Sequence, residues 1–374
     1  MAGHSTNGLV RLLVLAALTG ACLPTPAGQG GQRTGLVFRG ASDASAAVAV
    51  DGNTLLVADD ENNVLRVYRA DGGLPVSRFD LTGFLGVTAK SPEADIEAAA
   101  RIGGRVYWIT SHGRNREGKW RPNRHRFFAT EVAVGPEGVS IRPVGRPCTA
   151  LADEMAGHEA LRALCPDLAH SARPDGADEK AGKRLAPKGE GLNIEGLCAD
   201  DDGRRLYVGL RNPLAAGARG GKPRALVVPL LNPAEVVEGG RTPRLGRPML
   251  WDLGGLGVRD MVRCERRRGT FVLAGPHDEG ERFALYRWSG KAGEPPVLVR
   301  RLDGEPPGWH PEALVSFAGS PRLLLLSDDG GVAVPVSGPS DCIEKEDYRP
   351  DGTCPNKRLR DESRRSFRGR WITP

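Results

Sequence analysis

The chain has 374 residues, of which 40% are hydrophobic and 5% aromatic, and its 52 basic and 46 acidic residues give a formal net charge of +6. This apolar content excludes a disordered chain and is enough for a substantial core. Both signs of charge are spread along the chain, so the composition gives no support for nucleic-acid binding. The 50 glycines and 29 prolines suit many short strands joined by turns, so we expect an all-β fold.

The first 22 residues have the pattern of a bacterial export signal. Arg11 precedes a short apolar run, and small residues then lead to Cys22, as in a relaxed lipoprotein processing box. Two outcomes remain open: Cys22 carries a lipid anchor, or the signal is cleaved and the chain is released. Either outcome predicts an extracytoplasmic protein that meets a membrane only through Cys22, with residues 23–34 as a flexible tether.

A hairpin that recurs five times dominates residues 35–374. In each copy a short polar or acidic residue comes just before two short apolar runs, which flank a turn rich in Gly, Asp or Asn. Such self-similarity is typical of a propeller-like repeat. The repeated polar position falls at Ser45, Glu97, Glu195, Asp260 and Glu312.

The spacing of these positions predicts the number of blades. A four-stranded blade takes roughly 40 to 50 residues, whereas the step from Glu97 to Glu195 is longer. We therefore place an insertion at residues 148–191, with one short helix at its start. The last ten residues are expected to close the ring beside the strand that follows Gly35. The prediction is a single five-bladed propeller over residues 35–374; a sixth, degenerate blade within the inserted regions is the alternative.

Six cysteines follow Cys22, an even number in a compartment that permits disulfides. The pairing that is local in sequence joins Cys148 to Cys165 and Cys342 to Cys354, and leaves Cys198 and Cys264 on equivalent inner strands. No C-x-x-C spacing occurs, which argues against a zinc–thiolate site.

Three segments resemble an exported bacterial family whose function is not established. They are residues 193–197 (NIEGL), 209–214 (GLRNPL) and 367–371 (FRGRW). The resemblance implies a propeller and carries no activity. Residues 58–72 are also similar to an NHL-type repeat, and the IEGL element is similar to one in phytase-like esterase propellers.

One face of the predicted propeller gathers the polar positions, because the first strand of a hairpin starts where the second one ends. We expect Glu97, Glu195, Asp260 and Glu312 to be metal ligands there, since calcium and magnesium take oxygen ligands from several chain segments. The alternative is that each carboxylate accepts backbone amides of the neighbouring blade and fixes its geometry.

The loops on this face add further candidates. The predicted proton-transfer residues are His112 and His277, and the predicted ligand-binding residues are Arg211, Asn212, Asp59 and Asp328. Arg211 either clamps Glu195 or receives an anionic group in two parallel hydrogen bonds. The basic loop around Trp120, residues 111–128, is either solvated or holds an anion such as phosphate.

No nucleophile elbow, phosphate-binding loop or zincin helix occurs in the chain. We therefore predict a monomeric module that binds a small molecule or an envelope partner on its central face. The alternative is a phosphoester or ester hydrolase assisted by calcium or magnesium, in which Arg211 holds the anionic group and His112 or His277 moves protons. A third hypothesis is a lipoprotein that binds a partner through the basic loop.

Overall fold

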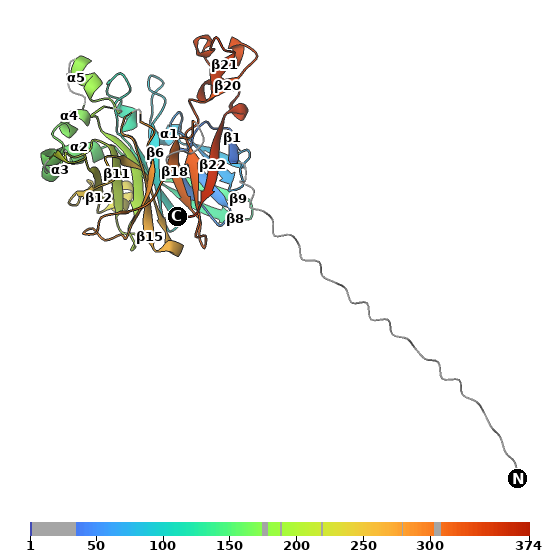
Figure 1. The fold of residues 1–374 in the computed structure, drawn as a ribbon, viewed down its shortest axis with the longest axis horizontal. Coiled ribbons are helices and arrows are strands. Elements are labelled where there is room, and N and C mark those ends of the chain that lie inside the picture. Colours follow the sequence, from blue (N-terminus) through green and yellow to red (C-terminus); the bar gives the residue numbers. More distant parts are fainter. Residues whose placement is uncertain (2–34, 174–178, 188, 218–219, 279, 303–307) are drawn as a thin grey trace. The chain divides into compact units, whose positions relative to one another are not determined.

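The computed structural model describes residues 1, 35–173, 179–187, 189–217, 220–278, 280–302 and 308–374. The predicted export signal, Cys22 and the tether at residues 23–34 lie outside the described residues. Residues 35–374 form one unit of five four-stranded antiparallel sheets (Figure 1). The prediction of a five-bladed propeller is therefore confirmed. Among the described residues, no helix is long and apolar enough to cross a membrane.

Each blade is a meander that starts at its innermost strand. Blade 1 consists of β2 (Ala46–Ala49), β3 (Thr54–Ala58), β4 (Val64–Arg69) and β5 (Ser77–Asp80). Blade 2 consists of β6 (Ile96–Ile102), β7 (Arg105–Thr110), β8 (Phe127–Gly135) and β9 (Gly138–Cys148). Blade 3 consists of β10 (Asn193–Ala199), β11 (Leu206–Asn212), β12 (Ala225–Leu230) and β13 (Met249–Trp251). Blade 4 consists of β14 (Gly257–Cys264), β15 (Gly269–Gly275), β16 (Ala284–Trp288) and β17 (Val297–Arg301).

Blade 5 closes the ring by joining both ends of the described unit. Its strands run from β18 (Pro311–Ser316) through β19 (Leu323–Ser327) and β22 (Ser366–Ile372) to β1 (Leu36–Arg39) at the outer edge. β1 pairs with β22 in antiparallel register, as the sequence predicts. Phe38 stacks on Phe367 with ring centroids 4.9 Å apart, and the edge of Tyr68 from blade 1 packs against both rings. The N-terminal strand therefore joins blade 5 to blade 1.

Small residues at the inner strands let five sheets meet around one axis. A Cβ at Gly196 or Gly209 would lie 2.6 Å from the Val258 side chain, so blade 3 packs on blade 4 only where both positions are glycine. Apolar side chains fill the spaces between neighbouring sheets, and the fully buried Trp108, Trp251 and Trp288 contribute the largest ones. The inner strands, such as β3, β10, β11 and β15, bury both faces and have nearly continuous apolar runs, whereas the outer strands β9 and β17 are largely exposed.

Two insertions and several short helices extend from this frame. Four short helices lie between β9 and β10 where one was predicted: α2 (Leu151–Gly157), α3 (Glu159–Leu164), α4 (Leu168–Ser171) and α5 (Glu179–Arg184). The helices α1 (Thr82–Leu85) and α6 (Pro233–Gly239) were not predicted. Short 3-10 turns are η1 (Pro122–Arg124), η3 (Glu265–Arg267), η4 (Pro339–Asp341), η5 (Lys345–Asp347), η6 (Asn356–Arg358) and η7 (Glu362–Arg364).

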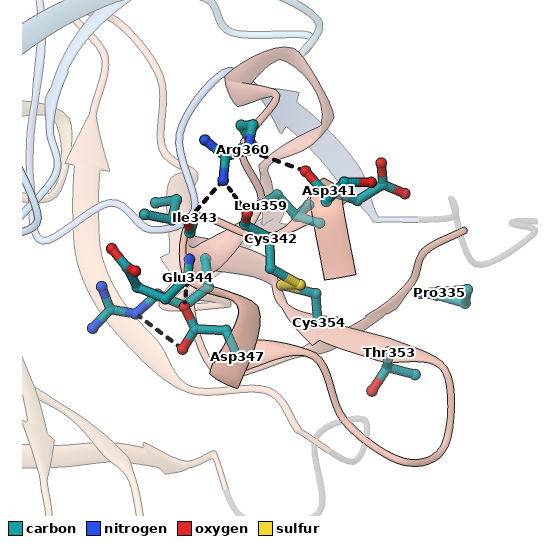
Figure 2. Close-up of a disulfide and its surroundings, with 12 residues drawn as sticks. Pro335, Asp341, Cys342, Ile343, Glu344, Asp347, Thr353, Cys354, Leu359 and Arg360 are labelled. Carbon is teal, nitrogen blue, oxygen red and sulfur yellow. Dashed lines mark hydrogen bonds and ion pairs between the residues drawn. A yellow bond between two sulfur atoms is a disulfide. The ribbon is translucent and has the colours of Figure 1, made fainter. Parts of the chain in front are cut away.

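The second insertion interrupts blade 5 between β19 and β22. Its short strands β20 (Ala333–Pro335) and β21 (Thr353–Pro355) pair with each other and stand out beyond the blades in Figure 1. The Cys342–Cys354 disulfide, with Cα atoms 6.2 Å apart, fastens the loop between them, which confirms this predicted pair (Figure 2). Leu359 packs against both cysteines and completes a small local core.

The other four cysteines among the described residues are free, so the predicted Cys148–Cys165 disulfide is wrong. Cys165 is buried in the core between blades 2 and 3, and Cys148 packs at the margin of the same core. Cys198 and Cys264 are also buried free thiols. These residues fill space as small apolar side chains, which spacing along the chain does not distinguish from a disulfide framework.

Candidate functional site

In four of the five blades a shared backbone irregularity directs one side chain toward the same end of the propeller. The ladders β6/β7, β10/β11, β14/β15 and β18/β19 each shift register after their first or second pair. The residues left unpaired at these shifts are Glu97, Glu195, Arg259 and Glu312. Such bulges re-aim a side chain away from the regular alternation. The bulges therefore mark the repeated position of a blade more reliably than the acidic character of the residue does.

The register corrects the prediction for blade 4, because Arg259 and not Asp260 occupies the repeated position. Arg259 is buried, with its Nε 3.0 Å from Glu195 Oε2 and its Nη2 donating to Glu312 Oε1 at 2.6 Å. The sequence comparison aligned the acidic residues of the repeats and therefore selected Asp260 instead of Arg259. The available signal was the apolar residue before the position, since Val258 stands where blade 3 has Ile194.

Asp260 lies one residue further along β14 and has a different environment. Its Oδ1 accepts the Met261 amide and its Oδ2 accepts the Leu314 amide of blade 5, both at 2.7 Å. Burial raises the pKa of Asp260 to about 8 even though these amides favour the charged form. It belongs to none of the groups of neighbouring carboxylates formed by the described residues. This carboxylate fits the alternative reading, in which an acidic residue fixes the geometry between blades.

Arg211 takes the clamp role, one of its two predicted roles. Its Nη1 donates to Glu195 Oε1 at 3.0 Å, and its Nε donates to the Pro276 carbonyl at 3.0 Å. The neighbouring Asn212 donates from Nδ2 to the carbonyls of Pro187 and His277. Both side chains therefore hold the loop that follows β15, and Asn212 also holds the insertion before β10. Arg211, Arg259 and Asn193, whose Nδ2 donates to Glu195 Oε1 at 2.8 Å, surround Glu195.

We call Glu195, Arg211, Arg259 and Glu312 the arginine network. Two guanidinium groups lie beside its two carboxylates, so charges of opposite sign balance within it. Burial still raises the pKa of Glu312 to about 8, although Arg259 opposes that shift. A buried pair of this kind is held by its mutual geometry, and either partner alone would be an uncompensated charge.

Blades 1 and 2 carry a second set, the blade 1–2 carboxylates: Asp43, Asp59, Asp60, Asp95 and Glu97. Within each of two triads, Asp43–Asp59–Asp60 and Asp60–Asp95–Glu97, one oxygen of every carboxylate lies within 4.8 Å of the others. Glu97 also lies within this distance of Glu195 and Glu312, and so connects the two sets. Only Glu97 and Asp59 of the five were predicted site residues.

Glu97 is the least satisfied residue of the site. Its side chain is 8% exposed, and no described residue offers its carboxylate a hydrogen bond or an ion pair. Burial, followed by Asp95 and Glu195, raises its pKa well above the usual range. Asp60 has a similar environment, because its Oδ1 is buried without a partner and its pKa is also raised by burial and by neighbouring acids.

Basic groups reach the edge of the blade 1–2 carboxylates. Arg124 Nη1 lies 3.1 Å from Asp95 Oδ2, and Lys357 of the blade 5 insertion lies 2.5 Å from Glu61 Oε1. Asp59 accepts the Glu61 amide at 2.8 Å, although burial raises its pKa. Asp95 adopts a φ of 64°, an uncommon backbone conformation for a residue with a side chain. Such conformations persist where the surroundings fix them, often at functional sites.

The predicted histidines differ in their surroundings. His112 is buried, and its Nδ1 lies 2.8 Å from the Thr110 carbonyl, which leaves Nε2 without a partner. Burial lowers the pKa of His112 to about 4, so its imidazole is neutral at pH 7. His277 is half-buried at the loop after β15 and contributes its carbonyl to Asn212. Asp328 is also half-buried, and its carboxylate accepts the Gly330 amide at 2.8 Å.

The basic loop is built into the fold. Arg114 is buried and donates to the carbonyls of Gly118, His170 and Arg173, and so fastens the loop to the helical insertion. Arg126 donates to the carbonyls of Leu85 and Pro122. The arginines that give this loop its basic composition therefore act largely as structural donors.

Comparisons with known proteins place the chain in a family. A family model described as "Protein of unknown function (DUF3616)" matches residues 43–129 and 177–301, more than half of the chain. None of the curated proteins matches the sequence. Solved structures with similar folds include Myxococcus xanthus glutaminyl cyclase, with 11% identity, a TM-score of 0.39, and coverage of 90% of this chain and 95% of that chain.

The PQQ-bound aldose sugar dehydrogenase from Streptomyces coelicolor is 14% identical with a TM-score of 0.38, and the match covers 79% of this chain and 93% of that chain. A chain of the nidogen–laminin complex is 11% identical with a TM-score of 0.36, and the match covers 76% of this chain and 73% of that chain. At these identities and TM-scores the similarities carry no information on function.

Proposed function

The chain belongs to the family described as "Protein of unknown function (DUF3616)", and we propose that its propeller is an extracytoplasmic binding module that captures a hard divalent cation on its central face. The cation lies against Asp60, Asp95 and Glu97. Calcium and magnesium suit this position, because both prefer carboxylate oxygens drawn from separate segments of a chain.

One observation carries this proposal. Glu97 is 8% exposed, has no partner among the described residues, and lies within 4.8 Å of four other acidic residues, including Asp60 and Asp95. A buried carboxylate without a partner is unfavourable, whether it holds a proton or remains charged. A divalent cation supplies the missing positive charge and the missing ligands for the oxygen atoms at once.

The charge balance favours blades 1 and 2 over the propeller axis. Glu195 and Glu312 already have guanidinium partners in Arg211 and Arg259. Asp60 and Glu97 have no ion pair with any described residue. A cation that bound Glu195 and Glu312 would also lie close to Arg259, which electrostatic repulsion disfavours. Of the four metal ligands predicted from the sequence, the proposal therefore keeps Glu97 and adds Asp60 and Asp95 as its partners.

Isothermal titration tests the site directly. The full chain, stripped of metal with EDTA and dialysed, is titrated with calcium, magnesium and manganese chloride. We expect one of these cations to bind the wild-type protein and binding to weaken at least tenfold in Glu97→Gln. The matched control is Glu137→Gln, an exposed position in the turn between β8 and β9. If no cation binds, or if Glu97→Gln binds as well as the wild type, the proposal is wrong.

The hydrolase alternative depends on His112. With Nδ1 directed at the Thr110 carbonyl, Nε2 is left as a proton acceptor, which is the tautomer a general base needs. Its low pKa makes it a weak base. A screen of p-nitrophenyl phosphate, bis(p-nitrophenyl) phosphate and p-nitrophenyl acetate with each cation tests this alternative. If the wild type turns over one of these esters, and His112→Gln abolishes turnover but not calcium binding, the protein is an enzyme and not only a binding module.

The extracytoplasmic part of the proposal rests on the export pattern before Cys22 and on the disulfide of the blade 5 insertion. Fractionation of cells that express the full chain, followed by mass spectrometry of the mature N-terminus, tests it. A lipid-modified Cys22 or a cleaved signal supports export. Retention of the intact chain in the cytoplasm contradicts it.

A further inference from the structure

The propeller carries a second hollow at the end opposite the carboxylates. A cavity of about 610 Å³ lies where the first strands of all five blades end in their hairpin turns. Each blade contributes, from Gly52 in blade 1 to Gly319 in blade 5. Its volume is in the range of pockets that bind small molecules. The cation site does not use any of the residues that line it.

Half-buried apolar side chains form part of the cavity wall. Ala49, Ile102, Ala199 and Val262 line the cavity, and each remains partly exposed. The cavity therefore offers a surface on which an apolar group loses contact with water, which contributes roughly 25 cal/mol per Å² buried.

Acidic side chains predominate at the mouth of the cavity. Five of the lining residues are acidic: Asp51, Asp200, Asp201, Asp202 and Glu265. The basic ones are Arg101, Arg263 and Arg266. Arg101 donates to the carbonyls of Ala49 and Gly103, and Arg263 is paired with Asp201.

Two of the acids remain available to a ligand. Asp202 and Glu265 are exposed on the turns of blades 3 and 4, and neither pairs with a described basic residue. Asp200, by contrast, pairs with Arg205 at 2.9 Å. Asp51, Asp202 and Glu265 lack a basic partner among the described residues and outnumber Arg101 and Arg266, so the charge at the mouth favours a cationic ligand group over an anionic one.

We propose that this cavity binds a small primary amine with an apolar body. The apolar body lies against Ala49, Ile102 and Ala199, and the ammonium group lies at the mouth near Asp202 and Glu265. A carboxylate of the same size would meet net negative charge at the mouth, and an alcohol would lose the ion pair. This site is independent of the cation site, since the two lie at opposite ends of the propeller.

Calorimetry with three matched probes tests the assignment, with EDTA present throughout so that the cation site stays empty. The probes are 2-phenylethylamine, 2-phenylethanol and 3-phenylpropionate, which share a phenyl ring and a short chain and differ in charge. We expect 2-phenylethylamine to bind at least tenfold more tightly than 3-phenylpropionate. Asp202→Asn combined with Glu265→Gln should remove that preference. Equal binding of all three probes would overturn the charge assignment.

A filled cavity provides the control on location. Ala49→Phe places a ring in the cavity wall, whereas Ala133→Phe adds the same ring on the exposed surface of β8. We expect Ala49→Phe to abolish binding of 2-phenylethylamine and Ala133→Phe to leave it unchanged, with both variants folded by circular dichroism. Unchanged binding in Ala49→Phe, or no binding by the wild type, would overturn the proposal.

The thiol of Cys198 gives a second readout if Ala49→Phe fails to fold. Cys198 is a free cysteine in the cavity wall and is 2% exposed. Alkylation by N-ethylmaleimide, followed at Cys198 by peptide mass spectrometry, should slow at least threefold when 2-phenylethylamine is present. Cys165, buried in another core, serves as the internal control and should not change. Equal slowing at both cysteines, or none at Cys198, would contradict occupancy of the cavity.

Discussion

The two sides of the central face solve the same electrostatic problem differently. In the arginine network, Glu195 and Glu312 lie against two guanidinium groups that the protein itself supplies. On the side of blades 1 and 2, Asp60 and Glu97 are brought together with no such group. On this side the arginine, Arg124, pairs with Asp95 and leaves Asp60 and Glu97 without a basic partner, so a position remains for an external cation.

The largest expected effect comes from breaking the arginine network. Arg259→Met leaves Glu195 and Glu312 without their shared partner, and an uncompensated buried charge costs about 3 to 5 kcal/mol. Urea denaturation should show a loss of this size in the free energy of unfolding. Arg263→Met removes a partly exposed pair with Asp201 and should cost less than about 1 kcal/mol. Similar losses in the two variants would mean that Arg259 is not essential to the network.

Asp260 gives the next largest effect. Asp260→Ala leaves the buried amides of Met261 and Leu314 without an acceptor, and each such group costs about 1 to 3 kcal/mol. The same urea experiment should report a loss in this range with no change in cation affinity. Asp202→Ala, on an exposed turn, is the control and should be neutral. A loss of cation affinity in Asp260→Ala would restore this residue to the metal site.

The pH dependence of stability sharpens the comparison further. Burial raises the pKa of Asp260 from 3.8 and that of Glu312 from 4.5, each to about 8. The folded chain thus keeps protons that the unfolded chain releases, so the free energy of unfolding should fall as pH rises from about 4 to about 8. Denaturation in EDTA at several pH values measures this slope, and Asp260→Asn should flatten it. Stability that rises over this range would contradict the burial of these groups.

The smallest expected effect concerns the free thiols. Since Cys148 forms no disulfide and is half-buried, Cys148→Ser should change the midpoint of thermal unfolding little. Alkylation of the unreduced, denatured chain should label Cys148, Cys165, Cys198 and Cys264 and spare Cys342 and Cys354. Protection of Cys148 and Cys165 in that experiment would reinstate the bond that the sequence suggested.

Local patterns were sufficient to predict the frame of the molecule. Alternating apolar runs and turn residues located all five inner hairpins, and the need to cover open edges predicted the pairing of β1 with β22. Both depend on interactions between residues close in sequence or on a simple rule of closure. The blade 5 insertion followed from the local Cys342–Cys354 spacing only in part, because its β20–β21 pairing has no strong pattern.

The site was harder to predict, because its chemistry depends on register between strands. Matching blades by acidity selected Asp260, whereas the bulge in β14 presents Arg259. Asp43 and Asp95, two residues before the repeated position, join the site through a similar offset that only the folded register reveals. Whether a carboxylate is compensated, as Glu195 is and Glu97 is not, depends on contacts between blades that no single repeat contains.

The most direct test of the central claim is thermal unfolding of the wild type and Glu97→Gln at pH 8, in EDTA and in saturating calcium. The account predicts a reversal: in EDTA the variant is more stable, because it lacks an uncompensated buried carboxylate, whereas in calcium the wild type gains stability that the variant does not. At a calcium concentration 100 times the dissociation constant, that gain is about 2.7 kcal/mol. A variant that is less stable in EDTA and responds equally to calcium would contradict the account.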